Sequence, residues 1–258
     1  LILARHEDMK LTGKRHPYVS DYKIGLSKEG KILAYEVTYY QNSGAVADLS
    51  TAILDRTLAH CTNSYFIPNV KATGWCCKTN LPPNTAFRGL GGPQGMFVIE
   101  SAIHKASKKL GLEPYVLQSL NLLNEGDEFP YGQKTENCKA RECFDTLNNK
   151  HNLSEVKNSI DSFNLNNILV KKGYAVMPIC FGISFTNTML NQASALIHVY
   201  NDGSVGVSTG AVEMGQGVNM KIRQITASAF GIDVSLVKTE NTNTTRNANT
   251  SATAASSG

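Results

Sequence analysis

Two glycine-rich turns carry the groups in this sequence that could do chemistry. They are residues 87–94 (FRGLGGPQ) and 213–217 (EMGQG), and each precedes a run with helical periodicity. The first turn of a helix leaves backbone N–H groups without partners, so either turn could hold a phosphate or another anion. Arg88 adds planar donors that suit oxygen ligands. Neither turn matches a dinucleotide-binding or P-loop pattern, so the turns alone name no reaction.

The other reactive residue types show no arrangement that indicates a site. The six histidines lack HExxH or another ligand spacing, and no G-x-S-x-G nucleophile motif occurs. The six cysteines include Cys138 and Cys143 but no CxxC, which favours reduced thiols in a cytoplasmic protein over a disulfide scaffold or a metal site. Arg56 follows Asp55 in an apolar run, and the pattern alone favours a local ion pair there.

Helices and strands must position these turns. Apolar residues at three- and four-residue steps predict a helix from Pro93 to a stop at Gly111, and further helices from Pro114, over 154–163 and after Gly217. Runs of β-branched and aromatic residues predict hairpins, at 17–27 with 32–42 and around 200–204, and strands over 174–186 and 236–239. The sequence therefore predicts a mixed α+β fold.

Composition limits the class of protein and suggests its organisation. The chain has 258 residues, 41% of them hydrophobic, and a net charge of +4 with no dense basic block. We therefore expect a globular protein without a nucleic-acid surface, and no apolar run approaches the roughly 20 residues of a membrane span. An Asn-, Ser- and Lys-rich stretch at 151–172 is expected to connect two lobes, 1–150 and 173–258. Both ends suggest an internal fragment of a longer polypeptide.

The last residues allow two interpretations. From Asn241 to Gly258 no apolar side chain is larger than alanine, and composition favours a flexible terminus. The alternative is a loop whose backbone approaches a ligand closely.

Five ordered motifs together resemble the molybdopterin-binding part of the xanthine dehydrogenase and aldehyde oxidase family. They are residues 7–9 with 12–17, 78–96, 181–186, 213–217 and 249–256, and they extend from one end of the chain to the other. The resemblance overrides the compositional preference for a flexible tail. It implies two lobes of the family's molybdopterin-binding domain, with sheets packed against helices.

The resemblance implies a cofactor and the residues that hold it. The family uses molybdopterin with molybdenum for water-derived hydroxylation, and it passes electrons to 2Fe–2S clusters and FAD in other domains or subunits. By resemblance, the backbone around Arg88 packs on the molybdenum centre without supplying a side-chain ligand. The remaining cofactor-binding positions lie in the second glycine-rich turn and in the tail: Met214, Gly215, Gln216, Thr253, Ala255 and Ser256.

The same resemblance implies a substrate site. Arg56 matches the position where xanthine-oxidising members place an arginine that faces a purine oxygen, and this predicts hypoxanthine or xanthine as substrate. Phe185 and Thr186 match positions that contact the substrate ring. Leu90 departs from the family pattern, which commonly has a stacking phenylalanine there.

The resemblance also implies what this stretch of chain lacks. The family's base glutamate is expected beyond Gly258, so the chain alone should be inactive and Glu213 is not the base. An aldehyde or N-heterocycle hydroxylase of the same family, and a non-catalytic remnant or scaffold, remain alternatives. A complete enzyme of this kind is expected to be a cytoplasmic homodimer or multimer.

Overall fold

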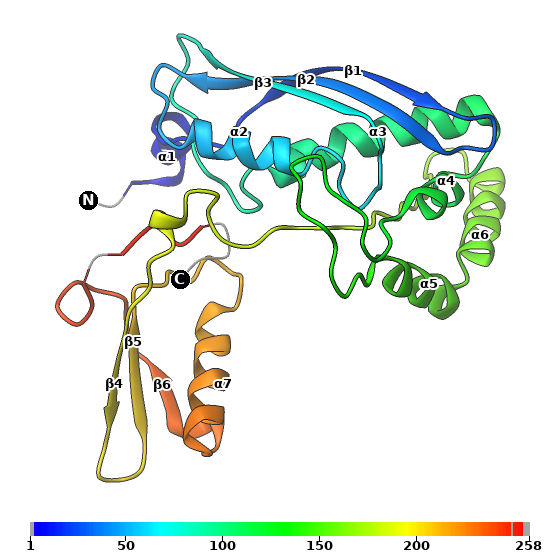
Figure 1. Cartoon of the computed structure of the whole chain (residues 1–258). Helices are drawn as coiled ribbons and strands as arrows, with labels where there is room; N and C mark the ends of the chain where they lie inside the picture. Colours follow the sequence, from blue (N-terminus) through cyan, green and yellow to red (C-terminus); the bar gives the residue numbers. More distant parts are fainter. Residues whose placement is uncertain (1–2, 249, 255–258) are drawn as a thin grey trace. The chain divides into compact units, whose positions relative to one another are not determined.

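The computed structural model describes residues 3–248 and 250–254, and it divides into two compact units, Leu1–Gly182 and Ile183–Gly258 (Figure 1). Each unit has its own sheet and its own core. The division into functional lobes at 151–172 stays a prediction, because the compact units are defined by contacts within the chain and divide at a later residue.

The first unit is built on a three-stranded sheet. Strand β1 (Tyr18–Leu26) pairs antiparallel with β2 (Ile32–Gly44), and β3 (Val70–Lys78) pairs parallel with β2. Helices α2 (Ser50–Ala59) and α3 (Gly92–Leu110) lie along one face of this sheet (Figure 1). Four more helices complete the unit: α1 (Arg5–Leu11), α4 (Pro114–Asn121), α5 (Ala140–His151) and α6 (Leu153–Asn166).

The core of this unit forms where β2 meets α3. Tyr35, Val37 and Tyr39 alternate along β2 and are almost fully buried, as are Ile99 and Ile103 one turn apart on α3. A two-residue period on the strand and a four-residue step on the helix bring one apolar face of each element together. This packing fixes the N-terminal end of α3, where the first glycine-rich turn lies.

The second unit is smaller. Strand β4 (Ala195–Val199) pairs antiparallel with β5 (Val205–Thr209), and β6 (Val237–Thr239) pairs parallel with β5. Helix α7 (Val218–Phe230) contributes Ala227 to the core that the sheet forms. Two short 3₁₀ helices complete the unit: η1 (Thr188–Leu190) and η2 (Val234–Leu236).

The structure confirms the mixed α+β class and most of the predicted elements. The helices from Pro93 and Pro114, the helix over 154–163 and the helix after Gly217 all form, as do both hairpins and the short strand near 237. Both Gly91 and Gly111, at the two ends of α3, adopt the left-handed conformation that glycine tolerates best. Pattern analysis missed α1, α2, β3 and α5.

The predicted strand over 174–186 is wrong. These residues are all described, and none of them joins a strand ladder. Residues 174–180 nevertheless alternate between half-buried and exposed, which is the two-residue period of an extended chain. The segment is extended, but side chains of the first unit take its backbone hydrogen bonds in place of a neighbouring strand.

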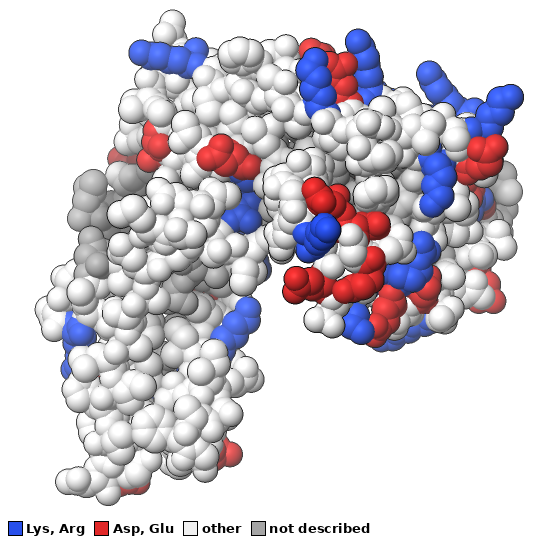
Figure 2. Space-filling model, viewed as in Figure 1, with Lys and Arg blue, Asp and Glu red and all other residues white. Residues whose placement is uncertain are grey.

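Charged side chains show no single-sign surface on the face in Figure 2. Basic and acidic residues alternate there over the first unit, and few charged residues appear on the second. Among the described residues, no helix is long and apolar enough to cross a membrane.

Candidate functional site

The first glycine-rich turn is held from two sides by the rest of the first unit. The backbone runs through three successive left-handed residues, Gly89 (φ 98°), Leu90 (φ 42°) and Gly91 (φ 86°). A Cβ on Gly91 would lie 2.1 Å from the carbonyl oxygen of Ile53 on α2, so only glycine allows this approach. Thr57 of α2 donates its hydroxyl to the Gly91 carbonyl at 3.0 Å. Helix α2 therefore fixes the backbone of the turn at Gly91.

Arg15 braces the same turn from the other side. Its Nη2 donates to the carbonyl oxygen of Arg88 at 2.6 Å, and its guanidinium lies 4.6 Å from the centre of the Phe87 ring. The Arg88 side chain itself is exposed. The backbone of Arg88 is therefore fixed by Arg15, and its side chain lies outside the core. The family resemblance assigns this backbone to cofactor binding.

Residues 174–182, which we name the strap, are docked on the first unit by side chains. Gln118 donates to the Val176 carbonyl and Asn63 to the Pro178 carbonyl, both at 2.7 Å, while the Cys180 N–H donates to Asn63 Oδ1 at 3.2 Å. Glu100 accepts hydrogen bonds from the Asn63 and Gln118 amides and from Tyr65. Burial raises the pKa of Glu100.

Arg56 lies at the end of the strap. It is 4% exposed, and its Nη1 donates to the Gly182 carbonyl at 2.8 Å. The Gly182 N–H donates to His60 Nε2 at 2.8 Å. The Phe181 ring lies 4.8 Å from the His60 ring and 5.8 Å from the guanidinium, measured to ring centres. Burial lowers the pKa of Arg56, although a guanidinium remains charged at any ordinary pH.

Phe181 also joins the strap to the first glycine-rich turn. A Cβ on Gly92 would lie 2.3 Å from a carbon of the Phe181 ring, so the ring packs directly on the N-terminal end of α3. Arg56, the strap and the turn that contains Leu90 therefore form one assembly within the first unit. Leu90 itself is 4% exposed.

The second glycine-rich turn holds itself. The carboxylate of Glu213 accepts hydrogen bonds from the backbone N–H groups of Gly215 at 2.9 Å, Gly217 at 3.0 Å and Asn219 at 3.1 Å. These bonds lower the pKa of Glu213. The N–H groups at the start of α7, which the sequence offered to a phosphate, are taken by the chain's own carboxylate, and an external anion has to replace it.

The predicted cofactor positions around this turn remain accessible. Met214 is 61% exposed, and neither Gly215 nor Gly217 has a neighbouring atom within 4 Å of an added Cβ. Gln216 donates to the Val212 carbonyl at 2.8 Å and accepts from the Met214 N–H at 2.5 Å. The turn therefore presents backbone and a flexible apolar side chain to its surroundings.

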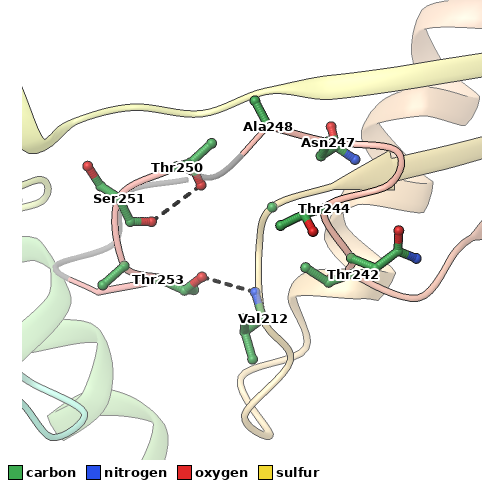
Figure 3. A pocket seen from close by; sticks show the side chains of 11 residues that line it. Val212, Thr242, Thr244, Asn247, Ala248, Thr250, Ser251 and Thr253 are labelled. Atoms are coloured by element: carbon green, nitrogen blue, oxygen red, sulfur yellow. Dashed lines mark hydrogen bonds between the residues drawn. The ribbon is translucent and has the colours of Figure 1, made fainter.

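A pocket of about 270 Å³ lies between this part of the second unit and the described tail (Figure 3). Small side chains line it, most of them of polar residue types, and those labelled in Figure 3 include Val212, Thr242, Thr244, Asn247, Thr250 and Thr253. Thr253 Oγ1 accepts from the Val212 N–H at 3.0 Å, which ties the tail to the segment before Glu213. Ala255 and Ser256 lie outside the described residues.

Phe185 and Thr186, the positions predicted to contact the substrate ring, belong to the second unit. Phe185 is buried, and its backbone exchanges hydrogen bonds with the Asn191 side chain, at 2.8 Å from its N–H and 3.3 Å to its carbonyl. Thr186 is exposed. The Asn191 contact fixes the backbone at the position that precedes Thr186.

Comparison with known proteins decides the family. The molybdopterin cofactor-binding domain models match residues 1–122 and 146–258. The chain is 47% identical over 255 residues to the xanthine dehydrogenase/oxidase of Gallus gallus and 44% identical over 256 residues to the xanthine dehydrogenase of Dictyostelium discoideum. In each case the match covers 99% of this chain and 19% of the relative. The chain belongs to the xanthine dehydrogenase and aldehyde oxidase family of molybdenum hydroxylases.

Solved structures of molybdenum hydroxylases have the same fold. The aldehyde oxidoreductase of Desulfovibrio gigas matches with a TM-score of 0.76 at 26% identity, covering 92% of this chain and 26% of that one. The quinoline 2-oxidoreductase of Pseudomonas putida matches with a TM-score of 0.83 at 20% identity, covering 98% and 34%. The chain thus consists of two molybdopterin cofactor-binding domains and spans about a fifth of the length of its curated relatives.

The donor set of the pocket in the second unit fits a pterin. Hydroxyl and amide groups from Thr242, Asn247 and Thr253 can pair with the polar edge of a neutral heterocycle, and none of the described residues that line the pocket is charged. Small side chains let such a ring approach the backbone closely. The residues present therefore suit this part of the molybdenum hydroxylase cofactor.

Sequence reasoning missed the residues that hold the predicted ones. Each of them has a partner far away in the sequence: Thr57 bonds 34, Arg15 73 and His60 122 positions away. Nothing local marks them, although a histidine four residues after an arginine on an amphipathic helix places the two side chains on one face. Glu213 had a local signal, since an acidic residue just before a helix is a common N-terminal cap.

Proposed function

We propose that this chain is the molybdopterin-binding part of a xanthine dehydrogenase-like hydroxylase that oxidises hypoxanthine or xanthine. The observation that carries the proposal is the buried guanidinium of Arg56, oriented by the Gly182 carbonyl at 2.8 Å. High identity to two proteins named as xanthine dehydrogenases supports it.

Arg56 would act on the substrate through its charge. Oxidation of a purine places negative charge on its exocyclic oxygen in the transition state, and a fixed cation lowers the energy of that charge. A guanidinium has five N–H donors, so the bond that orients Arg56 is compatible with a second hydrogen bond to a substrate oxygen. Because Arg56 is 4% exposed, little water screens this interaction.

Each glycine-rich turn would contribute to cofactor binding from its own unit. We assign the backbone of Arg88 to the molybdenum side and Met214, Gly215, Gln216 and Thr253 to the pterin, with Ala255 and Ser256 outside the described residues. When bound, molybdopterin supplies the redox chemistry that these side chains lack. Arg15 and Glu213 keep the two turns in shape for it.

An aldehyde or N-heterocycle hydroxylase of the same family is the second candidate. Leu90 favours it, because an aliphatic side chain stands where purine oxidisers commonly stack an aromatic ring. The likeness to an aldehyde oxidoreductase is consistent with it. Turnover of hypoxanthine, nicotinate and an aromatic aldehyde by the complete enzyme separates the two candidates.

Replacing Arg56 by methionine in the complete enzyme tests the proposal. We expect kcat/KM for xanthine to fall by about 10²-fold, as for other removed transition-state donors, and kcat/KM for an aldehyde to fall much less. The exposed Arg5 provides a matched control, and Arg5→Met should leave both values unchanged. Equal losses with both substrates would contradict the role of Arg56.

Molybdenum and pterin analysis of the same preparations tests the third alternative, a non-catalytic remnant or scaffold. A complete protein without either would indicate a non-catalytic scaffold.

We further propose that the complete enzyme is a cytoplasmic homodimer or multimer that passes electrons through 2Fe–2S and FAD domains. The six cysteines, all of them free, are consistent with a reducing compartment.

A further inference from the structure

The hydrogen bonds around His60 determine which of its ring nitrogens carries the proton. Nε2 accepts a hydrogen bond from the Gly182 N–H at 2.8 Å, so this nitrogen carries a lone pair and no proton. The proton therefore lies on Nδ1, which faces the Arg56 carbonyl at 2.9 Å and donates to it. His60 is thus neutral, with a defined tautomer.

His60 and Arg56 both form hydrogen bonds with the backbone of one residue, Gly182. The histidine accepts from the N–H of Gly182, and the arginine donates to its carbonyl. A Cβ on Gly182 would lie 2.7 Å from Arg56 Nη1, so the backbone passes in direct contact with the guanidinium. The place of the guanidinium therefore depends on Gly182, and the place of Gly182 depends on His60.

We propose that neutral His60 is a positioning residue for Arg56, and that protonation of His60 releases Gly182 and misplaces the guanidinium. This proposal rests on the function proposed above for Arg56. A protonated His60 turns a second N–H towards the N–H of Gly182, so the acceptor is lost. It also places a second positive charge beside Arg56. Turnover of the purine should consequently fail on the acid side.

The groups around His60 favour its neutral form. Burial lowers the pKa of His60 most, the hydrogen bond with the Arg56 carbonyl raises it by less, and the charge of Arg56 lowers it by less still. Tyr131 and Cys180 lie near the same site, and burial raises the pKa of both, so they are uncharged near neutral pH. Glu100 on α3 bonds to Asn63. Because the folded chain lowers the pKa of His60, its hydrogen bond with the Gly182 N–H is fully present above pH about 6.5, the ordinary histidine pKa. The bond is lost as the pH falls towards the lower pKa of the folded state.

Two variants of the complete enzyme separate the hydrogen bond from the titration. In His60→Gln the amide oxygen can accept from Gly182 at any pH, whereas His60→Leu has no acceptor. We expect His60→Gln to keep kcat/KM for xanthine within about 3-fold of wild type at pH 8 and to lose the acid limb of the pH profile. We expect His60→Leu to lose more than 10-fold at pH 8. His198→Gln, on an exposed strand position, serves as control.

Hydrogen exchange at the Gly182 amide gives a readout that does not need turnover. In wild type its protection factor, corrected for intrinsic exchange, should decrease as the pH is lowered. It should stay constant in His60→Gln and be lost in His60→Leu. An unchanged acid limb in His60→Gln, or a protected Gly182 amide in His60→Leu, would overturn the proposal. A pH-dependent amide in an enzyme that does not oxidise purines would instead reject the proposed function and leave the positioning role intact.

Discussion

The two glycine-rich turns look alike in sequence, but distant residues stabilise the first and its own residues stabilise the second. The turn before α3 is fixed by distant residues: Thr57 and Ile53 of α2, Arg15, and Phe181 of the strap. The turn before α7 is fixed by its own residues: Glu213 accepts from backbone N–H groups two to six positions away, and Gln216 bonds to the backbone of Val212 and Met214. A glycine-rich turn before a helix therefore does not by itself identify a ligand site. Its partners decide whether it is a packed junction or an exposed, self-capped end.

The largest expected effect comes from adding one methyl group to each turn. Gly91→Ala places a Cβ 2.1 Å from the Ile53 carbonyl, whereas Gly217→Ala meets nothing within 4 Å, although both residues have positive φ. We expect Gly91→Ala to destabilise the first unit by about 3 kcal/mol or more, and Gly217→Ala to cost about 1 kcal/mol, the backbone strain alone. Denaturant unfolding, followed locally by hydrogen exchange, measures both. Equal costs would contradict the distinction between the two turns.

A smaller effect should follow from removing the brace on the first turn. Arg15→Met loses the bond to the Arg88 carbonyl and the contact with the Phe87 ring, and we expect a loss of about 1–3 kcal/mol. Arg246→Met is the matched control, because it loses an ion pair with Glu240 near the surface of the second unit and should cost at most about 1 kcal/mol. If the control cost more than Arg15→Met, the brace would have no special role.

The smallest effect is expected at Glu213, and it should remain local. Glu213→Gln removes the charge, so the amides of Gly215, Gly217 and Asn219 should exchange a few-fold faster. The pKa of Glu213 is lowered in the folded chain, so its contribution is present above the ordinary value of about 4.3 and is lost as the pH falls through the lower folded value. Exchange rates of the first unit should not change.

The same contrast explains what the sequence could predict. Helix α3 was predicted with both ends because its apolar steps, Pro93 and Gly111 are local signals. The strap was predicted to be a strand because its run of apolar residues is a local signal too, whereas its partners Asn63 and Gln118 lie 115 and 58 positions away. No pattern of a single segment distinguishes a neighbouring strand from a row of side-chain amides.

The candidate site divides in the same way. Arg56 was found through the family resemblance, and the pattern alone favoured an ion pair with Asp55. Its partner Gly182 lies 126 positions away, which no local rule connects. The roles of the predicted site residues stay predictions, and the contacts that position them come from the fold.

A double-mutant cycle between Gly92 and Phe181 tests most directly whether the strap and the first turn form one assembly. A Cβ on Gly92 would lie 2.3 Å from the Phe181 ring, so Gly92→Ala should destabilise the first unit clearly when the ring is present. In the background of Phe181→Ala the same change should cost little, which corresponds to a coupling energy above about 1 kcal/mol. Additive costs would mean that the ring and the turn are independent, and they would contradict this account.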